Sequence, residues 1–320
     1  MSSLVAPAPR TFPGISPASW EHPTDRAALA SLRTVLGANV AHALARLGLP
    51  TTLLMPLSRD ALGERFLTAL SAAGVRLPLA ASSDMPTSVA LVSLQEGQPR
   101  YSLYRDGVAD RDLRHEQILA ALPRHPAVHV LGAFCYAVEP DRSFWLRIAD
   151  ESRRRGALLS SDPNIRAAVM DRAGETPAGM LRALRESDIV KASDEDLAWL
   201  FPQIPPHDVA REWSRRHGLL ALLTEGAGGV TAFAGDLEIH RPARSVDIVD
   251  TVGAGDAFVA AFLSRGLATG VLDGASARDA SALADLLDFA NAAAALCCAR
   301  AGADSATTTQ VVSFLQSSSA

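Results

Sequence analysis

The sequence of 320 residues has little of what marks secreted, metal-bound or membrane-spanning proteins. Its three cysteines, Cys135, Cys297 and Cys298, are too few and too unevenly placed for a disulfide framework or a zinc site. No apolar run reaches the roughly 20 residues that cross a bilayer. The first residues lack a charged start followed by an apolar core, so we expect no signal peptide. We therefore expect a cytoplasmic protein whose cysteines act as small buried apolar residues.

A strong charge of either sign is also missing. The net charge is −5, and the 30 basic and 35 acidic residues are interspersed. We therefore expect neither a nucleic-acid partner nor a membrane surface, although a nucleotide needs only a few local donors. The eight histidines show no metal-ligand spacing. Apolar residues make up 48% of the chain, enough to bury a sizeable core in one large α/β domain or two small ones.

The pattern of the chain changes along its length. Residues 1–27 are rich in proline and predict an irregular segment. Apolar residues at helical spacing predict helices over 39–47 and 60–74. We assign one domain to 28–312 and a tail to 313–320, with disorder expected in its last residues.

After the second helix the hydrophobic period changes to two. Ser88–Leu94 and Arg100–Tyr104 predict a hairpin, which we interpret as a small β flap around 88–111. Short apolar runs then alternate with helical stretches, which predicts a three-layer α/β/α fold with a mainly parallel central sheet. Ligands of such sheets bind beyond the carboxyl ends of the strands. The four predicted strands are Val128–Leu131, Ala157–Ser161, Asp188–Lys191 and Leu219–Thr224.

The segment D-T-V-G-A-G-D at 250–256 precedes an apolar stretch, which predicts a glycine-rich loop opening a buried helix. The backbone N–H groups of Gly253, Ala254 and Gly255 would lack helical partners and could bind an anion, aided by the helix dipole. An acid at Asp256 would repel a phosphate, unless it accepts the proton of an incoming hydroxyl during phosphoryl transfer. The alternative interpretation is a helix cap. No Gly-Lys-Ser/Thr follows, so this is no Walker A loop.

This segment resembles the C-terminal signature of the ribokinase-like, or phosphofructokinase-B, carbohydrate kinases. Further segments between about residues 35 and 305 resemble other motifs of the family, in the family's order. They are G-A-N-V-A at 37–41 with L-A-R-L-G at 44–48, D-P-N-I-R at 162–166, K-A-S-D-E-D at 191–196, T-E-G-A-G-G at 224–229, and A-N-A-A-A at 290–294 with R-A-G-A at 300–303.

Two stretches are similar to bacterial fructokinases in particular: Y-S-L-Y-R-D-G-V-A-D-R at 101–111 and V-K-A-S-D-E-D-L at 190–197. The resemblance implies an ATP-dependent kinase of a sugar hydroxyl, with fructose as the expected sugar. It also implies Mg²⁺, with K⁺ as a further cation. A homodimer through the β flap is a further expectation.

The resemblance also implies roles for individual residues at the sugar end. Asp256 would be the catalytic base, and the backbone at Gly253, Ala254 and Gly255 would hold the transferring phosphoryl group. Asn39 could instead be a helix N-cap, and Arg166, near Asn164, could be a solvated ion pair. The implied substrate-binding residues are Asn39, Tyr104, Arg166 and Asp256.

At the nucleotide end, Asp196 would act on Mg²⁺ through water, and Asp250 with Gly302 would hold the monovalent cation. Ser193 and Asp196 also fit a capping box, which needs no ligand. A strand-end turn explains Thr224 equally well. The implied nucleotide-binding residues are Ser193, Thr224, Gly226, Gly229, Gly253, Gly255 and Asn291.

The N-terminal part departs from the family pattern. A first strand with Gly-Glu and a sugar-binding Asp is not recognisable in 1–27, and Thr34 and Val35 stand where two glycines are expected. Three alternatives to a fructokinase therefore remain: a 2-keto-3-deoxygluconate kinase, a nucleoside kinase, or a nucleotide-binding relative with weak catalysis. We expect near-normal ATP binding beside weak sugar affinity.

Overall fold

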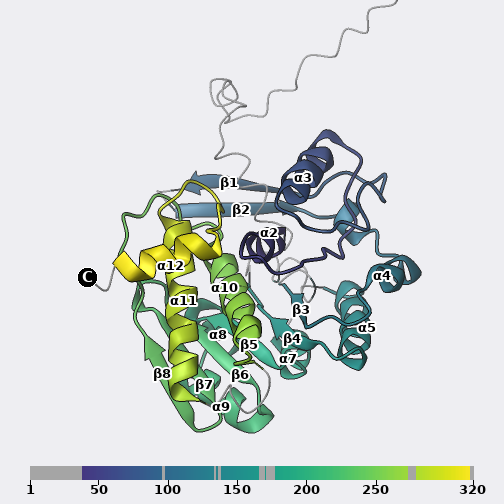
Figure 1. Ribbon diagram of the computed structural model, residues 1–320. Helices are drawn as coiled ribbons and strands as arrows, with labels where there is room; N and C mark the ends of the chain where they lie inside the picture. The colour runs from purple at the N-terminus through teal and green to yellow at the C-terminus, as the bar shows by residue number, and fades with distance from the viewer. Residues whose placement is uncertain are drawn as a thin grey trace, which may run out of the picture.

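The structure of the chain is a computed structural model, shown in Figure 1. The irregular segment predicted over 1–27 and the end of the predicted tail lie outside the residues that it describes. The described residues are 38–95, 98–132, 135, 138–165, 170, 177–272 and 279–317.

A six-stranded sheet with the order β3-β4-β5-β6-β7-β8 forms the centre of the protein. The first four strands of this order pair in parallel and the last two are antiparallel, which confirms a mainly parallel sheet. The four predicted strands match β3 to β6 within two residues. The strands are β3 (Val128–Leu131), β4 (Leu158–Ser161), β5 (Ile189–Ser193), β6 (Leu220–Thr224), β7 (Val230–Ala234) and β8 (Leu237–Arg241).

The two antiparallel strands were not anticipated from the sequence. β7 and β8 are joined by the two-residue turn Gly235–Asp236, between the paired residues Ala234 and Leu237. Gly235 has φ = 67°, a conformation that the first residue of such a turn requires. The pair extends the sheet beyond its parallel part.

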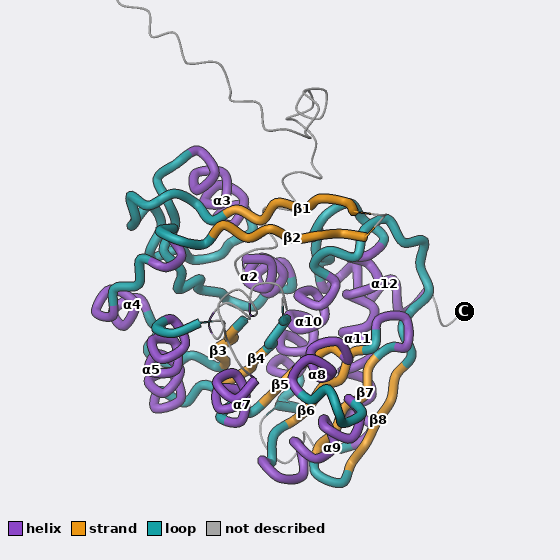
Figure 2. The backbone as a smooth tube through the Cα atoms, turned by 180° about the vertical axis from the view of Figure 1, so that it is seen from behind, coloured by secondary structure: helices purple, strands orange, loops and turns teal. Residues whose placement is uncertain are grey.

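Helices cover both faces of the sheet, as expected for three layers (Figures 1 and 2). Each layer has its own buried apolar cluster. One layer holds α2 (Ala38–Arg46), α10 (Ala254–Ala268), α11 (Ala280–Cys298) and α12 (Thr308–Ser317); the other holds α4 (His115–Ala121), α5 (Asp141–Arg154), α7 (Pro177–Arg185), α8 (Asp194–Leu200) and α9 (Pro206–His217).

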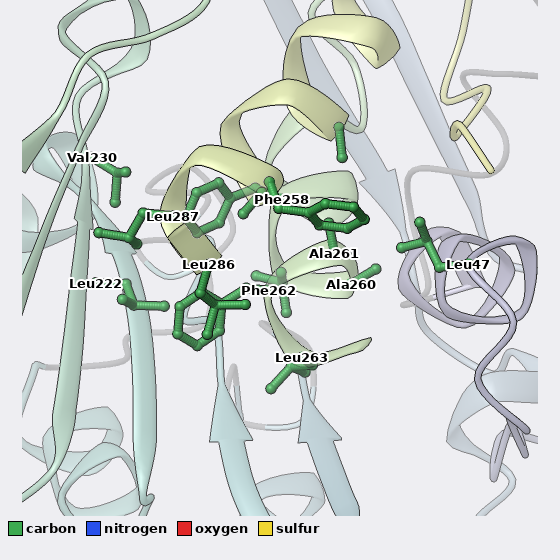
Figure 3. Packing of buried hydrophobic residues seen from close by; sticks show 14 of the residues in the cluster. Leu47, Leu222, Val230, Phe258, Ala260, Ala261, Phe262, Leu263, Leu286 and Leu287 are labelled. Carbon is green, nitrogen blue, oxygen red and sulfur yellow. The ribbon is translucent and has the colours of Figure 1, made fainter. Parts of the chain in front are cut away.

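The helices α10 and α11 form the centre of the first layer. Phe258 and Phe262 of α10 pack against Leu286 and Leu287 of α11, with Leu47 approaching from the other side (Figure 3). α11 is long and apolar enough to span a membrane, but 61% of its apolar window is buried inside the protein. Packing against α10 therefore accounts for its apolar composition.

The predicted β flap is present as a hairpin. β1 (Val89–Gln95) and β2 (Gln98–Tyr104) pair antiparallel as a separate sheet. In both views the hairpin lies at one end of the protein, across α2 and near α3 (Ala61–Ala72) (Figures 1 and 2). The flap is thus on the side where the first helix of the family motifs lies.

The domain assigned to 28–312 ends inside the last helix, α12. α12 continues to Ser317. Val311 is fully buried, and Phe314 and Leu315 pack against the core cluster of α10 and α11. Burial of these apolar residues keeps the last turn attached to the domain.

A buried histidine links β3 to the helix layer formed by α5. The His129 Nδ1 atom lies 2.6 Å from the Ser152 hydroxyl, and the residue is 9% exposed. Burial lowers the pKa of His129 to about 4. The side chain is therefore neutral at physiological pH.

We predict that this histidine makes the protein less stable in mild acid. Because the pKa of His129 is lower in the folded state, the unfolded state takes up the proton first, and stability falls between about pH 6.5 and pH 4. His129 alone should lower the free energy of unfolding by about 2 kcal/mol between pH 7 and pH 5. Urea unfolding of His129→Gln should show a drop smaller by that amount, whereas the exposed His125→Gln should behave like the wild type. Equal pH dependence in the wild type and His129→Gln would contradict it.

Candidate active site

The glycine-rich loop opens α10 as the sequence predicted. Gly253 precedes the helix with φ = 82°, in the left-handed region that favours glycine. A Cβ atom at this position would lie 2.5 Å from the Cβ of Ala303. The loop therefore requires glycine both for its backbone angle and for its contact with the chain after α11.

Backbone amides at the start of α10 are available to an anion. Among the described residues, the amides of Gly253 and Gly255 donate to no backbone carbonyl, whereas the amide of Ala254 donates a 3.3 Å hydrogen bond to Thr251. Of the three amides predicted to be unpaired, that of Ala254 is therefore already bonded. The helix dipole favours negative charge at the same place.

Asp250 ties this loop to the chain that follows α11. One of its carboxylate oxygens accepts from the amide of Val252 at 3.0 Å and the other from the amide of Gly302 at 2.8 Å. The structure therefore brings Asp250 and Gly302 together. Their role toward a monovalent cation stays a prediction. Within the described residues, no three His, Cys, Asp or Glu side chains form a cluster able to hold a metal ion.

Asn39 and Asp256 meet although 217 positions separate them in the chain. The Asn39 Nδ2 atom donates to Asp256 Oδ2 at 2.8 Å. Asn39 is 3% exposed and lies inside α2, which begins at Ala38. Its Oδ1 atom is buried and has no hydrogen-bond partner among the residues that the structure describes. The amide thus orients the predicted base and leaves one acceptor for another group.

A buried ion pair beside this loop was missed by the sequence analysis. The Lys191 Nζ atom lies 3.2 Å from Asp162 Oδ2, and both side chains are 8% exposed. Burial is the largest influence on Asp162 and raises its pKa to about 6, although Lys191 opposes the rise. Burial acts to lower the pKa of Lys191, but the surrounding carboxylates outweigh it, and the pKa is raised. The available signal was a lysine within the apolar strand Ile189–Ser193.

Asp196 joins two strand ends. Its Oδ2 atom accepts from the amide of Ser193, whose hydroxyl accepts from the amide of Asp196, so the predicted capping box is confirmed. Its Oδ1 atom accepts from the amide of Ile165 at 2.6 Å. Asp196 is 5% exposed. The roles of Ser193 toward a nucleotide and Asp196 toward Mg²⁺ stay predictions.

The turn after β6 has the geometry expected of a close backbone approach. Thr224 ends the strand, and its hydroxyl lies 3.5 Å from the carbonyl of Ala192. Gly226 has φ = 53° and Gly229 has φ = 102°. A Cβ atom on Gly229 would lie 2.2 Å from the carbonyl oxygen of Arg241. Gly229 therefore allows the turn to pack against the end of β8.

Asn291 binds the same chain segment from α11. Its Nδ2 atom donates to the carbonyls of Arg241 at 3.3 Å and Pro242 at 3.0 Å. The residue is 6% exposed. The polar side chain within this apolar helix thus has protein partners, which hold the loop after β8. Its predicted place beside a nucleotide stays a prediction.

The stretch 101–111 fixes the chain that leaves the flap. Tyr104 is 62% exposed at the end of β2. Arg105 pairs with Asp110 at 2.9 Å, and Arg111 pairs with Asp141 of α5 at 2.8 Å. The charges of this stretch therefore anchor the base of the flap. Arg166, the remaining predicted substrate contact, lies outside the described residues.

We predict that replacing Gly253 by alanine lowers the free energy of unfolding in two ways, through backbone strain and through a steric overlap. Gly48 has a similar φ of 90°, but a Cβ atom there would meet nothing within 4 Å. Gly48→Ala should cost roughly 1–2 kcal/mol through backbone strain alone. Gly253→Ala should cost about 1–3 kcal/mol more, because its Cβ atom would overlap Ala303. Urea unfolding of both variants measures the difference. Equal losses would show that the contact with Ala303 relaxes freely.

Comparison with known proteins agrees with this geometry. The model of the pfkB family carbohydrate kinases matches residues 36–310. Fructokinase-1 of Oryza sativa subsp. japonica is 34% identical over 278 residues, covering 86% of this chain and 84% of that protein. The fructokinase of Rhizobium leguminosarum bv. trifolii is 33% identical over 226 residues, covering 71% and 69%. The crystal structure of a fructokinase with bound ATP from Xylella fastidiosa is 25% identical, with a TM-score of 0.79 and coverage of 88% and 90%. The ribokinase-like chain belongs to the pfkB family of carbohydrate kinases.

Proposed function

We propose that this carbohydrate kinase transfers the γ-phosphoryl group of ATP to a hydroxyl of fructose, with Asp256 as the base. The observation that carries the proposal is the position of Asp256. It lies in the first turn of α10, behind Gly253 and Gly255, and receives a hydrogen bond from Asn39. A proton acceptor and an anion site thus share one helix end.

The reaction follows from this arrangement. The sugar hydroxyl gives its proton to Asp256 while its oxygen attacks the γ-phosphorus, and the bond to the β-phosphate oxygen breaks to release ADP. The amides of Gly253 and Gly255 face the helix end where the transferring charge would gather. Asn39 holds the carboxylate in place, and its buried Oδ1 atom can accept a sugar hydroxyl.

The proposed reaction also requires two cations. Two backbone amides cannot neutralise a triphosphate, and Mg²⁺ would supply the missing charge. Asp196 is the residue we assign to it, through water. Asp250 and the Gly302 backbone, joined by a 2.8 Å hydrogen bond, are the group that we assign to K⁺.

Fructose is favoured over other acceptors by two features. The rice and Rhizobium relatives are named fructokinases, and the two stretches similar to bacterial fructokinases are 101–111, from the end of β2 to the base of the flap, and 190–197, across β5 and the start of α8. A cytoplasmic location and a dimer through β1 and β2 stay predictions.

We predict that Asp256→Asn lowers kcat at least 10²-fold, because the variant keeps the size of the side chain but cannot accept a proton. The affinity for a non-hydrolysable ATP analogue, measured by calorimetry, should change little. Asp247→Asn is the matched control, since Asp247 is exposed on the loop before α10. Near-normal turnover of Asp256→Asn would leave Asp256 as a helix cap only.

We predict that fructose is the preferred acceptor in a panel with ribose, 2-keto-3-deoxygluconate and adenosine. ADP release should be measured with Mg²⁺, in the presence of K⁺ or of a large organic cation. Fructose should give the highest kcat/KM, but its KM should be high. The expected N-terminal sugar motif is not recognisable in the sequence, and each lost hydrogen bond costs about 0.5–1.5 kcal/mol. Preference for adenosine would replace the assignment by a nucleoside kinase, and no turnover with tight ATP binding would indicate a binding protein.

A further inference from the structure

Lys191 lies at a buried strand position that would ordinarily hold an apolar residue. It is the third residue of β5, and the side chains of a strand alternate between its two faces. Ile189 packs in the cluster of α10 and α11, whereas Val190 and Ala192 pack in the cluster on the opposite face. Lys191 therefore points to the α10 side of the sheet, where it is 6% exposed.

Three carboxylates from separate parts of the chain act on the charge of this ammonium group. Asp162 follows β4 and pairs with Lys191 at 3.2 Å. Asp196 of α8 and Asp256 of α10 both act on the charge of this pair. A buried ion pair is weak evidence for stability, because apolar residues of similar volume often stabilise a fold equally well or better. The pair therefore calls for a reason other than folding.

The ammonium group also lies close to the glycine-rich loop before α10. A Cβ atom on Gly255 would lie 3.2 Å from Lys191 Nζ and 3.9 Å from its Cε. The lysine thus lies directly against the second residue of α10, beside the amide that faces the anion. The glycine at 255 leaves room for the charge.

We propose that Lys191 is a positioning residue that compensates the negative charge of Asp162, Asp196 and Asp256, so that the γ-phosphate of ATP can approach the loop at Gly255. This inference rests on the proposed kinase reaction. Lys191 acts through the carboxylates and the glycine loop. Without it, the incoming phosphate would meet a cluster of acids at the point where the reaction needs positive potential.

The test uses Lys191→Met, Asp162→Asn and the double variant. Lys191→Met should lower kcat about 10²-fold, the size of effect seen when one preorganised electrostatic donor is lost. It should weaken a non-hydrolysable ATP analogue about tenfold and leave the Kd of ADP within about twofold, since ADP lacks the γ-phosphate. A purely structural lysine would not change the ratio of these two affinities.

The double variant separates the two roles. It removes the whole ion pair with little change in volume, so the melting temperature should return toward that of the wild type. The double variant has the same net charge around the loop as the wild type, so the proposal expects kcat and the ratio of ATP-analogue to ADP affinity to recover to within about threefold of the wild type. A double variant whose kcat and affinity ratio stay as far from the wild type as those of Lys191→Met would overturn it, because charge compensation would then not be what the lysine supplies.

A further variant covers the case in which both lysine variants fail to fold. Gly255→Ala keeps the charges in the chain but places a Cβ atom 3.2 Å from the ammonium group. It should weaken the ATP analogue more than ADP, and an unchanged ratio would overturn the proposal. The wild type, assayed alongside, shows whether the kinase reaction itself holds: a wild type without any turnover refutes the proposed function rather than the role of Lys191.

Discussion

The burial of α10 is the constraint on which the candidate site depends. Residues Ala257 to Ser264 are all buried, so the helix is enclosed by the sheet, α2 and α11 (Figure 3). A helix that is apolar on every side cannot rotate or slide without breaking this packing. Moving it by one turn would displace Asp256 by about 5.4 Å. The hydrophobic core therefore sets the position of Asp256, the proposed base, relative to Asn39 and the glycine loop.

Features encoded by neighbouring residues could be predicted from the sequence. β3 to β6 are continuous apolar runs, the capping box at Ser193 spans one helical turn, and the loop at 250–256 carries its own glycines. β8 was missed because it is only half-buried and has no continuous apolar run, and β7 was not assigned although its first four residues are buried; the Gly235–Asp236 turn between them was a usable signal. The end of α12 was assigned to the tail 313–320, although Phe314 and Leu315 pack against the core.

Contacts between distant segments could not be predicted from the sequence. The resemblance to the family indicated Asn39 and Asp256 separately. Only the fold shows that the Asn39 Nδ2 atom lies 2.8 Å from the Asp256 carboxylate. The same holds for Asn291, whose partners lie 49 and 50 positions away. Lys191 was overlooked because its apolar neighbours suggested an ordinary buried strand. A charged residue in such a strand has to find its partner in another element, which a linear pattern does not identify.

Apolar packing and the buried charged residues occupy different parts of this fold. The layers on the two faces of the sheet are packed with apolar side chains. Charged groups gather where β4 and β5 end and α10 begins, at the edge where parallel sheets bind ligands. Burial raises the pKa of Asp162 to about 6, so keeping this carboxylate ionised at neutral pH costs folding free energy. A buried pair with such a cost is weak evidence for a stabilising role, and it fits the proposal that Lys191 offsets the acids where a phosphate would bind.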